Sequence, residues 1–575
     1  MPPPPTAALS DVTVEEDLQV PMRDGTVLRA DVYRPHGATD LPVLLLRIPY
    51  DKFVAQSYVY GHPIWYARHG YIVVVQDTRG RYKSEGEFWP LRGEATDGAD
   101  TIEWCAALPG GSGKVGTFGF SYSGINQLLA GSLRPRGLGA ACPGFYPTSM
   151  HEGFGYVGGA FALSTMAQWL TILAGDRAVR LGMPETRSLI IDATVQVGRW
   201  SPNTTLHEIP LLAANPLTPF AAEMLAHPAY GEFWHESDLE RMAAPADLPC
   251  LHVSGWYDTF LRQTFDTYAR LTAAGKAEQR LLVGPWVHMP WAQHVGGLDF
   301  GREAGGHIVD RYQLAFYDAH LKGNRRALDA LPPVTVFLLG VNRWASYDAW
   351  PPPGTSSDAF YLHSGGKANS LDGDGVLSRE PPAGEFPDIF IYDPRMPVQS
   401  VGGHSCCSAA VSPMGPYDQS VVETRNDVLC YTTSPFDAPI EVLGSLELEL
   451  HAATTAADTD FTAKLCHVRH DGRVINLCEG IVRARFATDR TREILLPAGR
   501  VHRFIIALGE IAVHLAAGER LRLEVSSSNY PTFDRNPNTG GPLRTEAPLE
   551  MVAARQTIHH DAERASVLRL CTRVV

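Results

Sequence analysis

The segment 119–124 reads Gly-Phe-Ser-Tyr-Ser-Gly and places a serine in a setting that suits nucleophilic catalysis. A serine hydroxyl is a weak nucleophile at neutral pH, so it needs a neighbouring base and a fixed orientation. A sharp turn from a strand into a helix gives that orientation, and the strained turn needs small flanking residues. Gly119 meets this need, whereas Ser123 stands where the strict Gly-x-Ser-x-Gly pattern has glycine. The motif indicates Ser121 as a nucleophile for acyl transfer; the alternative is a strand end with two structural serines.

A base and an orienting acid are expected downstream of the serine, in the order Asp, His. Asp258 ends the run Gly-Trp-Tyr-Asp, His288 ends the run Gly-Pro-Trp-Val-His, and each run follows an apolar stretch. Open α/β sheets bind ligands beyond the carboxyl ends of their strands, so both side chains are expected to converge on Ser121. His288 would accept the serine proton, and Asp258 would orient the imidazole. As alternatives, Asp258 would cap a helix that begins at Phe260, and His288 would be one more structural or exposed histidine.

Strands must position these residues, and apolar runs of strand length precede each of them. Continuous Val, Leu and Ile runs are typical of strands that are buried on both faces of a parallel sheet. Such runs occupy residues 41–48, 71–76, 114–120, 249–254 and 280–283. Helical segments lie between or after them, at residues 96–108, 124–133, 260–274 and 309–321. This alternation predicts an α/β fold with crossover connections.

Two further regions depart from this alternation. From about residue 146 to 247, apolar residues recur at helical spacing with many Pro and Gly breaks, which predicts a helical insertion. Beyond the run Pro-Pro-Pro-Gly at 351–354, short strands follow one another with turn residues between them. Leu446, Leu448 and Leu450 alternate with polar residues there, as in a half-buried strand. A β-sandwich or jelly roll is expected for this C-terminal region.

The chain has 575 residues and a formal net charge of −14. That charge argues against nucleic acid and anionic membranes as partners. No apolar stretch approaches the roughly 18 residues that a transmembrane helix needs. The N-terminus, Met-Pro-Pro-Pro-Pro, lacks the basic and apolar regions of a signal peptide. A cytoplasmic protein is the resulting expectation.

The nine cysteines are scattered and form no Cys-x-x-Cys pair. Cys406 and Cys407 are adjacent, which is a poor geometry for bridging each other. A disulfide framework is therefore not expected, and a reducing compartment fits better. No cluster of His, Cys and Asp has the spacing of a zinc site, and no His-Glu-x-x-His motif occurs.

Seven segments together resemble the group of bacterial cocaine esterase, X-Pro dipeptidyl-peptidase and α-amino-acid ester hydrolase. They read Arg-Ile-Pro-Tyr-Asp-Lys at 47–52, Asp-Thr-Arg-Gly at 77–80, Ser-Glu-Gly at 84–86, Gly-Phe-Ser-Tyr-Ser-Gly at 119–124, Gly-Trp-Tyr-Asp at 255–258, Gly-Pro-Trp-Val-His at 284–288 and Asp-Thr-Asp-Phe at 458–461. The resemblance implies an α/β-hydrolase core with an inserted helical cap, followed by an all-β jelly-roll domain. The activity that it implies is an esterase or amidase that works through an acyl-enzyme, without a metal or a cofactor.

The domain boundaries implied by this resemblance agree with the changes of pattern along the chain. The α/β-hydrolase core would occupy residues 1–146 and 248–350, the helical cap residues 147–247, and the jelly roll residues 351–575. The serine turn of the family has the form Gly-x-Ser-Tyr-x-Gly, so Ser123 in place of glycine is a family trait.

The resemblance also implies an oxyanion hole. In this family the Tyr of the Pro-Tyr-Asp-Lys run, here Tyr50, points its hydroxyl at the developing oxyanion, beside the backbone N–H of the residue after the serine, here Tyr122. A phenol O–H is a suitable preorganised donor. Without the resemblance, Tyr50 would be interpreted as a residue that covers a strand end. Asp77 and Arg79 match the family as well, and we interpret them as residues that order loops.

Four aromatic side chains are candidates for an apolar acyl pocket: Phe120, Phe161, Trp169 and Trp256. The alternative is that they are core residues. The predicted function is a serine hydrolase that cleaves a carboxylic ester or amide of a small organic substrate. Three alternatives stay open: an acyltransferase with the same triad, an Xaa-Pro dipeptidyl-peptidase, and a catalytically inactive protein that binds carbohydrate through its jelly roll. A homo-oligomer also stays open.

Overall fold

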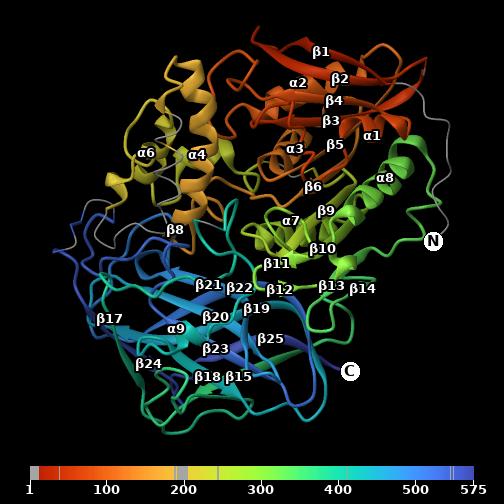
Figure 1. Ribbon diagram of the computed structural model, residues 1–575. Coiled ribbons are helices and arrows are strands. Elements are labelled where there is room, and N and C mark those ends of the chain that lie inside the picture. Colours follow the sequence, from red (N-terminus) through yellow and green to blue (C-terminus); the bar gives the residue numbers. More distant parts are fainter. Residues whose placement is uncertain are drawn as a thin grey trace.

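The computed structural model describes residues 12–575, apart from 38, 187–189, 191–204, 243–244, 410, 544–545 and 548. Two large sheets organise this part of the chain (Figure 1). The first sheet and its helices fill the upper part of the view, and the second sheet fills the lower part. The N-terminal segment 1–11 and the stretch 191–204 of the predicted cap lie outside the described residues.

In the described residues the first sheet has ten strands, in the order β1-β2-β4-β3-β5-β6-β9-β10-β13-β14. Their bounds are β1 Val12–Pro21, β2 Val27–Pro35, β3 Leu41–Ile48, β4 Ile72–Asp77, β5 Gly111–Phe120, β6 Leu138–Gly144, β9 Cys250–Tyr257, β10 Gln279–Val287, β13 Val334–Leu338 and β14 Arg343–Tyr347. Neighbours from β4 to β13 pair in parallel, whereas β1–β2, β2–β4 and β13–β14 pair antiparallel. Strands β4, β9 and β10 are buried along their whole length, which explains their largely apolar sequences. The predicted, mostly parallel sheet is confirmed.

Helices cover both faces of this sheet. They are α1 Pro63–Arg68, α2 Glu94–Ala106, α3 Tyr122–Ser132, α7 Leu261–Ala274 and α8 His307–Lys322. Alternate residues of β3 show the two layers. Leu44 and Leu46 pack with residues of α1 and α8, while Val43 and Leu45 pack with residues of α2. This arrangement is the α/β fold that the alternation of strands and helices predicts.

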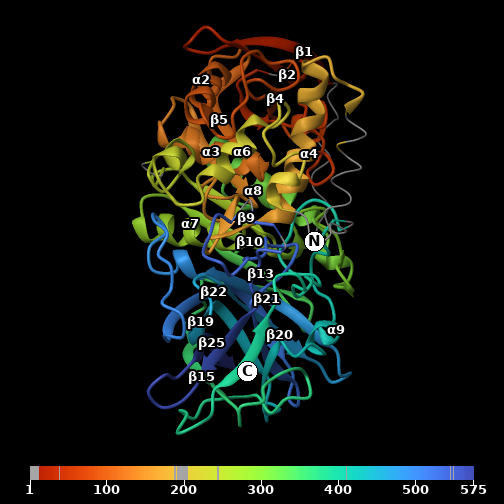
Figure 2. The same ribbon diagram turned by 90° about the vertical axis from the view of Figure 1, so that its left-hand side faces the viewer.

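The chain between β6 and β9 forms a further helical layer. It contains the short strands β7 (Tyr156–Val157) and β8 (Ala160–Phe161), the helices α4 (Leu163–Arg180) and α6 (Pro219–Ala226), and 3₁₀ turns at Leu206–Glu208 and Glu232–Ser237. Both α-helices stand at one side of the first sheet in Figure 1, and Figure 2 turns that side to the viewer. Leu170 of α4 and Phe220 of α6 belong to the same core cluster as Leu128 of α3. The helical layer is therefore packed onto the helix that follows Ser121. No helix in the described ranges is long and apolar enough to cross a membrane.

The second sheet comprises eleven strands in the described residues, in the order β17-β24-β19-β25-β15-β16-β18-β23-β20-β21, with β22 paired to β19. Their bounds are β15 Ser356–His363, β16 Val376–Ser378, β17 Asp388–Tyr392, β18 Leu429–Thr433, β19 Ile440–Thr454, β20 Asp460–Val468, β21 Val474–Arg483, β22 His502–Leu515, β23 Arg520–Ser526, β24 Ala554–His559 and β25 Val567–Val574. Short elements accompany the two sheets: β11 His294–Val295, β12 Leu298–Asp299 and α9 Ser420–Glu423. In β19, Leu446, Leu448 and Leu450 are buried while Glu447 and Glu449 are partly exposed. The predicted half-buried strand is confirmed.

A buried ion network joins the helical layer to the second sheet. Arg483 at the end of β21 contacts Asp460 Oδ2 at 2.8 Å and Asp534 Oδ1 at 2.9 Å. Asp534 Oδ1 also accepts the backbone N–H of Phe161 in β8 at 2.8 Å. Removal of one partner from a buried ion pair costs about 3–5 kcal/mol. The network therefore opposes separation of the two parts of the molecule.

Cys406 and Cys407 form a disulfide, which corrects the expectation drawn from their adjacency. Side chains of neighbouring residues point to opposite sides of an extended chain, but Cys407 has a φ of 77°, which turns the chain here. The other cysteines are free, and all of them but Cys571 are buried. The argument for a reducing compartment rested on the absence of disulfides, so this pair removes its support.

Candidate active site

Ser121 lies at the turn between β5 and α3. Its φ of 63° and ψ of −127° are a sparsely populated combination for serine. The backbone N–H of Ser121 donates to Gly144 O of β6 at 2.9 Å, and the backbone carbonyl oxygen of Ser121 accepts the N–H of Gly124 at 2.8 Å. The Gln56 side chain exchanges two hydrogen bonds of 3.2 Å with the backbone of Phe120. Contacts on both sides of the turn therefore hold the strained residue in place.

Small residues make this turn possible. A Cβ on Gly119 would lie 2.6 Å from Ser123 Cβ, and a Cβ on Gly124 would lie 2.6 Å from Gly144 O. Separations this short would force the backbone to shift. The glycines that the sequence motif singles out are therefore required by close approach of helix α3 to strands β5 and β6.

Asp258 and His288 follow β9 and β10, two neighbouring parallel strands. His288 Nδ1 lies 2.7 Å from Asp258 Oδ1, and the two side chains are 3% and 0% exposed. With its proton on Nδ1, the imidazole offers Nε2 as a base. The N-cap of α7 is Phe260, and the helix start receives no side-chain cap. The carboxylate of Asp258 thus serves the histidine and not the helix.

Tyr50 follows β3, the strand beside β5. Trp169 Nε1 of α4 donates to the Tyr50 hydroxyl oxygen at 2.9 Å. This bond uses a lone pair of the oxygen, so the phenol hydrogen stays available for another acceptor. Burial raises the pKa of Tyr50 to about 12, although hydrogen bonds with Trp169 and Ser121 lower it. The phenol is therefore protonated at neutral pH and is a donor beside Ser121.

Arg81 fixes the loop that carries Tyr50. Its Nε donates to Pro49 O at 2.9 Å, and a terminal nitrogen donates to Leu173 O of α4 at 3.1 Å. Helix α4 thus holds the loop through Arg81 and holds the phenol itself through Trp169. The helical layer thereby fixes the position of this hydroxyl.

Asp77 and Arg79 order neighbouring loops, in agreement with their interpretation from the sequence. The carboxylate of Asp77 accepts the backbone N–H of Lys52 at 2.7 Å. Arg79 pairs with Asp97 at 2.7 Å. Neither side chain lines the cavity at Ser121.

The backbone N–H of Tyr122 opens helix α3. The first N–H groups of a helix have no carbonyl partner within it. The side chain of Tyr122 is held away from Ser121, since its hydroxyl donates to Glu94 Oε1 at 3.0 Å and accepts the N–H of Leu91 at 3.1 Å. A backbone donor thus stands directly after the serine.

A cavity of about 300 Å³ opens at Ser121. It brings together five of the predicted site residues: Tyr50, Phe120, Ser121, Trp169 and His288. Asp258 lies behind His288 and does not line it. The cavity therefore places a serine hydroxyl, a histidine base and a phenol donor against one mostly apolar space.

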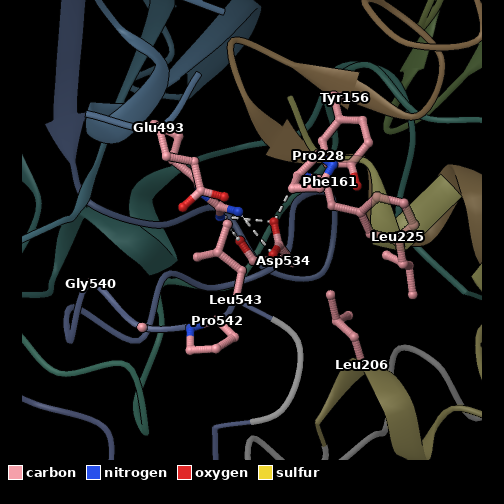
Figure 3. Close-up of a pocket in the computed structure, with 12 residues that line it drawn as sticks. Tyr156, Phe161, Leu206, Leu225, Pro228, Glu493, Asp534, Gly540, Pro542 and Leu543 are labelled. Atoms are coloured by element: carbon pink, nitrogen blue, oxygen red, sulfur yellow. Dashed lines mark hydrogen bonds and ion pairs between the residues drawn. The ribbon is translucent and has the colours of Figure 1, made fainter. Parts of the chain in front are cut away.

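The structure does not bring Phe161 and Trp256 to this cavity, which corrects their assignment to the acyl pocket. Phe161 belongs to β8 and lines a second cavity of about 350 Å³ (Figure 3). Trp256 is fully buried within β9. Its indole donates to Phe337 O at 2.6 Å and stacks on Phe265 of α7. Trp256 is a core residue because its strand lies beneath α7.

The second cavity differs from the first in the side chains that line it. Among the described residues that line it there is no serine, cysteine or histidine. Its charged groups are already paired, Asp534 with Arg483 and Glu493 with Arg485. In the part of the chain that the structure describes, no group of three or more His, Cys, Asp or Glu side chains could hold a metal ion.

Several cavity residues were missed in the sequence. Phe154, Phe260 and Met289 line the cavity together with the Cys406–Cys407 disulfide. Phe260 and Met289 follow Asp258 and His288 closely, so the rule that points to strand ends could have found them. The two cysteines come from a turn far downstream, for which no local pattern predicts a role.

Family models match both parts of the chain. The model of X-Pro dipeptidyl-peptidase (S15 family) matches residues 24–290, and that of the X-Pro dipeptidyl-peptidase C-terminal non-catalytic domain matches residues 326–569. The cocaine esterase of Rhodococcus sp. (strain MB1 Bresler) is 35% identical over 565 residues, which are 96% of this chain and 97% of that protein. This chain belongs to the S15 family. The resemblance to the cocaine esterase group is thereby confirmed.

Solved structures match this S15-family chain over nearly its whole length. An α-amino acid ester hydrolase has a TM-score of 0.84 and 25% identity and covers 100% of both chains. An aminopeptidase from the marine sediment archaeon Thaumarchaeota archaeon has a TM-score of 0.81 and 26% identity, with 98% of this chain and 97% of that chain covered. These matches confirm the α/β-hydrolase-type domain followed by an all-β domain. The S15-family chain is an ester hydrolase, a serine hydrolase of a group that acts on esters or dipeptides.

Proposed function

We propose that this enzyme hydrolyses carboxylic esters of small, uncharged, apolar acyl groups through an acyl-enzyme on Ser121. The observation that carries the proposal is the shared cavity. Ser121, His288 and Tyr50 line the same space of about 300 Å³, and Asp258 holds His288 from behind. A nucleophile, a base with its orienting acid and an oxyanion donor are the parts that acyl transfer needs.

The first half of the reaction forms the acyl-enzyme. Ser121 Oγ attacks the ester carbonyl carbon while His288 Nε2 takes the hydroxyl proton. Asp258 accepts the Nδ1–H of His288, which keeps the tautomer and stabilises the imidazolium. The carbonyl oxygen becomes an oxyanion, and the N–H of Tyr122 and the O–H of Tyr50 donate to it. When the C–O bond breaks, His288 returns the proton to the leaving alcohol.

The second half regenerates the enzyme. Water attacks the acyl carbon and gives its proton to His288 Nε2. The same two donors, at Tyr50 and Tyr122, stabilise the second oxyanion. The C–O bond to Ser121 then breaks, Ser121 recovers its proton from His288, and the carboxylic acid leaves.

The lining of the cavity supports an uncharged acyl group. Phe120, Phe154, Trp169 and Phe260 supply apolar and aromatic surface. No aspartate or glutamate stands among the described residues that line the space. Burial of a substrate ammonium group without a carboxylate partner is costly. This favours simple esters over α-amino esters and over dipeptides with a free N-terminus.

A comparison of two p-nitrophenyl esters and one p-nitroanilide tests this preference. We expect kcat/KM for p-nitrophenyl benzoate to exceed those for an α-amino acid p-nitrophenyl ester and for an Xaa-Pro p-nitroanilide. Product analysis with an added alcohol separates hydrolysis from transfer of the acyl group. A preference for either substrate that carries an ammonium group would contradict the proposed substrate class.

Tyr50→Phe removes the phenol donor and keeps the ring. Loss of one oxyanion donor lowers kcat by about 100–1,000-fold. We expect KM to change little, because the hydroxyl acts mainly in the transition state. Steady-state kinetics with p-nitrophenyl acetate measures both constants. Tyr361→Phe, which removes a phenol from strand β15, is a matched control with normal kcat. A raised KM with normal kcat in Tyr50→Phe would mean that Tyr50 only shapes the pocket.

A further inference from the structure

One wall of the catalytic cavity comes from a turn that lies outside the first sheet. Cys406 and Cys407 line the cavity with Ser121 and His288, and a disulfide joins their two sulfur atoms. Cys406 is 4% exposed, whereas Cys407 is partly exposed. A covalent bond between two wall residues thus borders the space where the acyl group would bind.

The turn is anchored on the side away from the cavity. Glu479 Oε1 of β21 accepts the N–H of His404 at 2.9 Å. His404 Nε2 donates to Trp256 O of β9 at 3.0 Å. The backbone of Ser405 forms a bridge with that of Asp258. The residues just before the disulfide are therefore tied to both sheets, next to the acid of the triad.

Close packing leaves this anchor little room to move. Gly403 has a φ of 98°, and a Cβ there would lie 2.2 Å from Glu479 Oε1. Glu479 is 5% exposed on its side chain. The chain that leads to Cys406 is therefore packed against Glu479, and a cavity of only about 60 Å³ borders His404 and Glu479 on this side.

We propose that the Cys406–Cys407 disulfide forms a redox-labile part of the wall of the substrate cavity. Its reduction decreases the cavity volume that is available to bulky acyl groups. The inference rests on the proposed function, since it assigns the acyl group to this cavity. Two bonded sulfur atoms lie about 2 Å apart, and two thiols must separate further because they are not bonded. Both cysteines line the catalytic cavity of about 300 Å³, so we expect a displaced thiol to move into its free volume.

The reduction needs a thiol reductant that reaches the pair. A dithiol attacks one sulfur of the pair as a thiolate, and the S–S bond breaks to give a mixed disulfide and one free cysteine. The second thiol of the reductant then releases the other cysteine and closes its own disulfide. Two electrons and two protons pass from the dithiol to Cys406 and Cys407. Because Cys407 is the more exposed residue of the pair, we expect the reductant to attack its sulfur first.

The test compares protein isolated without reductant and protein treated with dithiothreitol. Iodoacetamide alkylation and peptide mass spectrometry report which cysteines are thiols in each state. The kcat/KM ratio of p-nitrophenyl benzoate to p-nitrophenyl acetate reports the room for the acyl group. A fluorophosphonate reports in both states whether Ser121 is the nucleophile.

Two variants accompany the wild-type protein. Cys406→Ala/Cys407→Ala lacks the bond, and we expect its ratio not to respond to dithiothreitol. Cys571→Ala is the matched control, because Cys571 is a partly exposed free cysteine in β25. We expect this variant to respond as the wild type does.

We expect Cys406 and Cys407 to be alkylated only after reduction, and the benzoate-to-acetate ratio to fall about ten-fold, as a small change of an apolar pocket does. If Ser121 is labelled, three results would overturn the inference but leave the proposed function intact. They are free thiols at Cys406 and Cys407 before treatment, no alkylation of the pair after treatment, and an unchanged benzoate-to-acetate ratio in the reduced protein. An unlabelled Ser121 in both states would overturn the proposed function and the inference with it.

Discussion

Replacing Ser121 by alanine is expected to lower kcat by about a million-fold, because no acyl-enzyme can form without the hydroxyl. Ser121 is 7% exposed and loses a single oxygen atom, so the fold is expected to persist. The donors at Tyr50 and Tyr122 remain, and a residual rate above that of water is expected from them. Hydrolysis of p-nitrophenyl acetate measures the loss, and circular dichroism checks the fold.

Ser123→Ala is the matched control for this experiment. Ser123 is fully buried two residues after Ser121, and its hydroxyl has no hydrogen-bond partner in the described part of the chain. The alanine variant keeps the small side chain that Gly119 packs against, so it is expected to keep most of its activity. A Ser121→Ala protein that retained more than about a tenth of the normal kcat would rule out Ser121 as the nucleophile.

Asp258→Asn is expected to lower kcat by about 10,000-fold, with the geometry of the site nearly intact. An amide can donate to Nδ1 of His288, whereas the carboxylate only accepts from it. The imidazole would then carry its proton on Nε2 and could not take the proton of Ser121. The electrostatic stabilisation of the imidazolium is lost as well, because the neutral amide carries no negative charge.

Asp329→Asn controls for the general effect of losing a carboxylate. Asp329 is 57% exposed and pairs with Arg325 on the surface, so this variant is expected to have normal kinetics. Steady-state kcat at neutral pH is compared for the two variants. Similar small losses in both would show that Asp258 does not orient His288 during turnover.

The strands that hold the triad could be predicted because their sequences are extreme. Strands β9 and β10, which precede Asp258 and His288, are buried along their whole length, and burial of this kind leaves long apolar runs. Strand β22 gives no such signal, although it pairs with β19 along most of its length. Residues 503–509 alternate between outward and buried positions, but the outward Ile505 and Ala507 are apolar, so the sequence does not alternate between polar and apolar residues. Local pattern cannot tell a strand from a helix in such a segment.

Some site residues could likewise be predicted from the sequence, and others could not. Ser121, Asp258 and His288 each follow a parallel strand, so one rule of sheet topology predicted where all three would lie. Trp256 also precedes a strand end, but its side chain turns into the core under α7, which only the packing shows. The disulfide wall depends on a contact between the turn at Ser405 and Asp258, which follows β9. No spacing in the sequence encodes a contact of that kind.

The most direct test of the account is the site at which a fluorophosphonate labels the enzyme. The reagent forms a stable bond with a serine that a neighbouring base activates, and fluoride leaves. Peptide mass spectrometry of the wild-type protein is expected to find the label on Ser121, and labelling is expected to be lost in Ser121→Ala and slowed in Asp258→Asn. Label on a different serine, or active protein that carries no label, would contradict the assignment of Ser121 as the nucleophile.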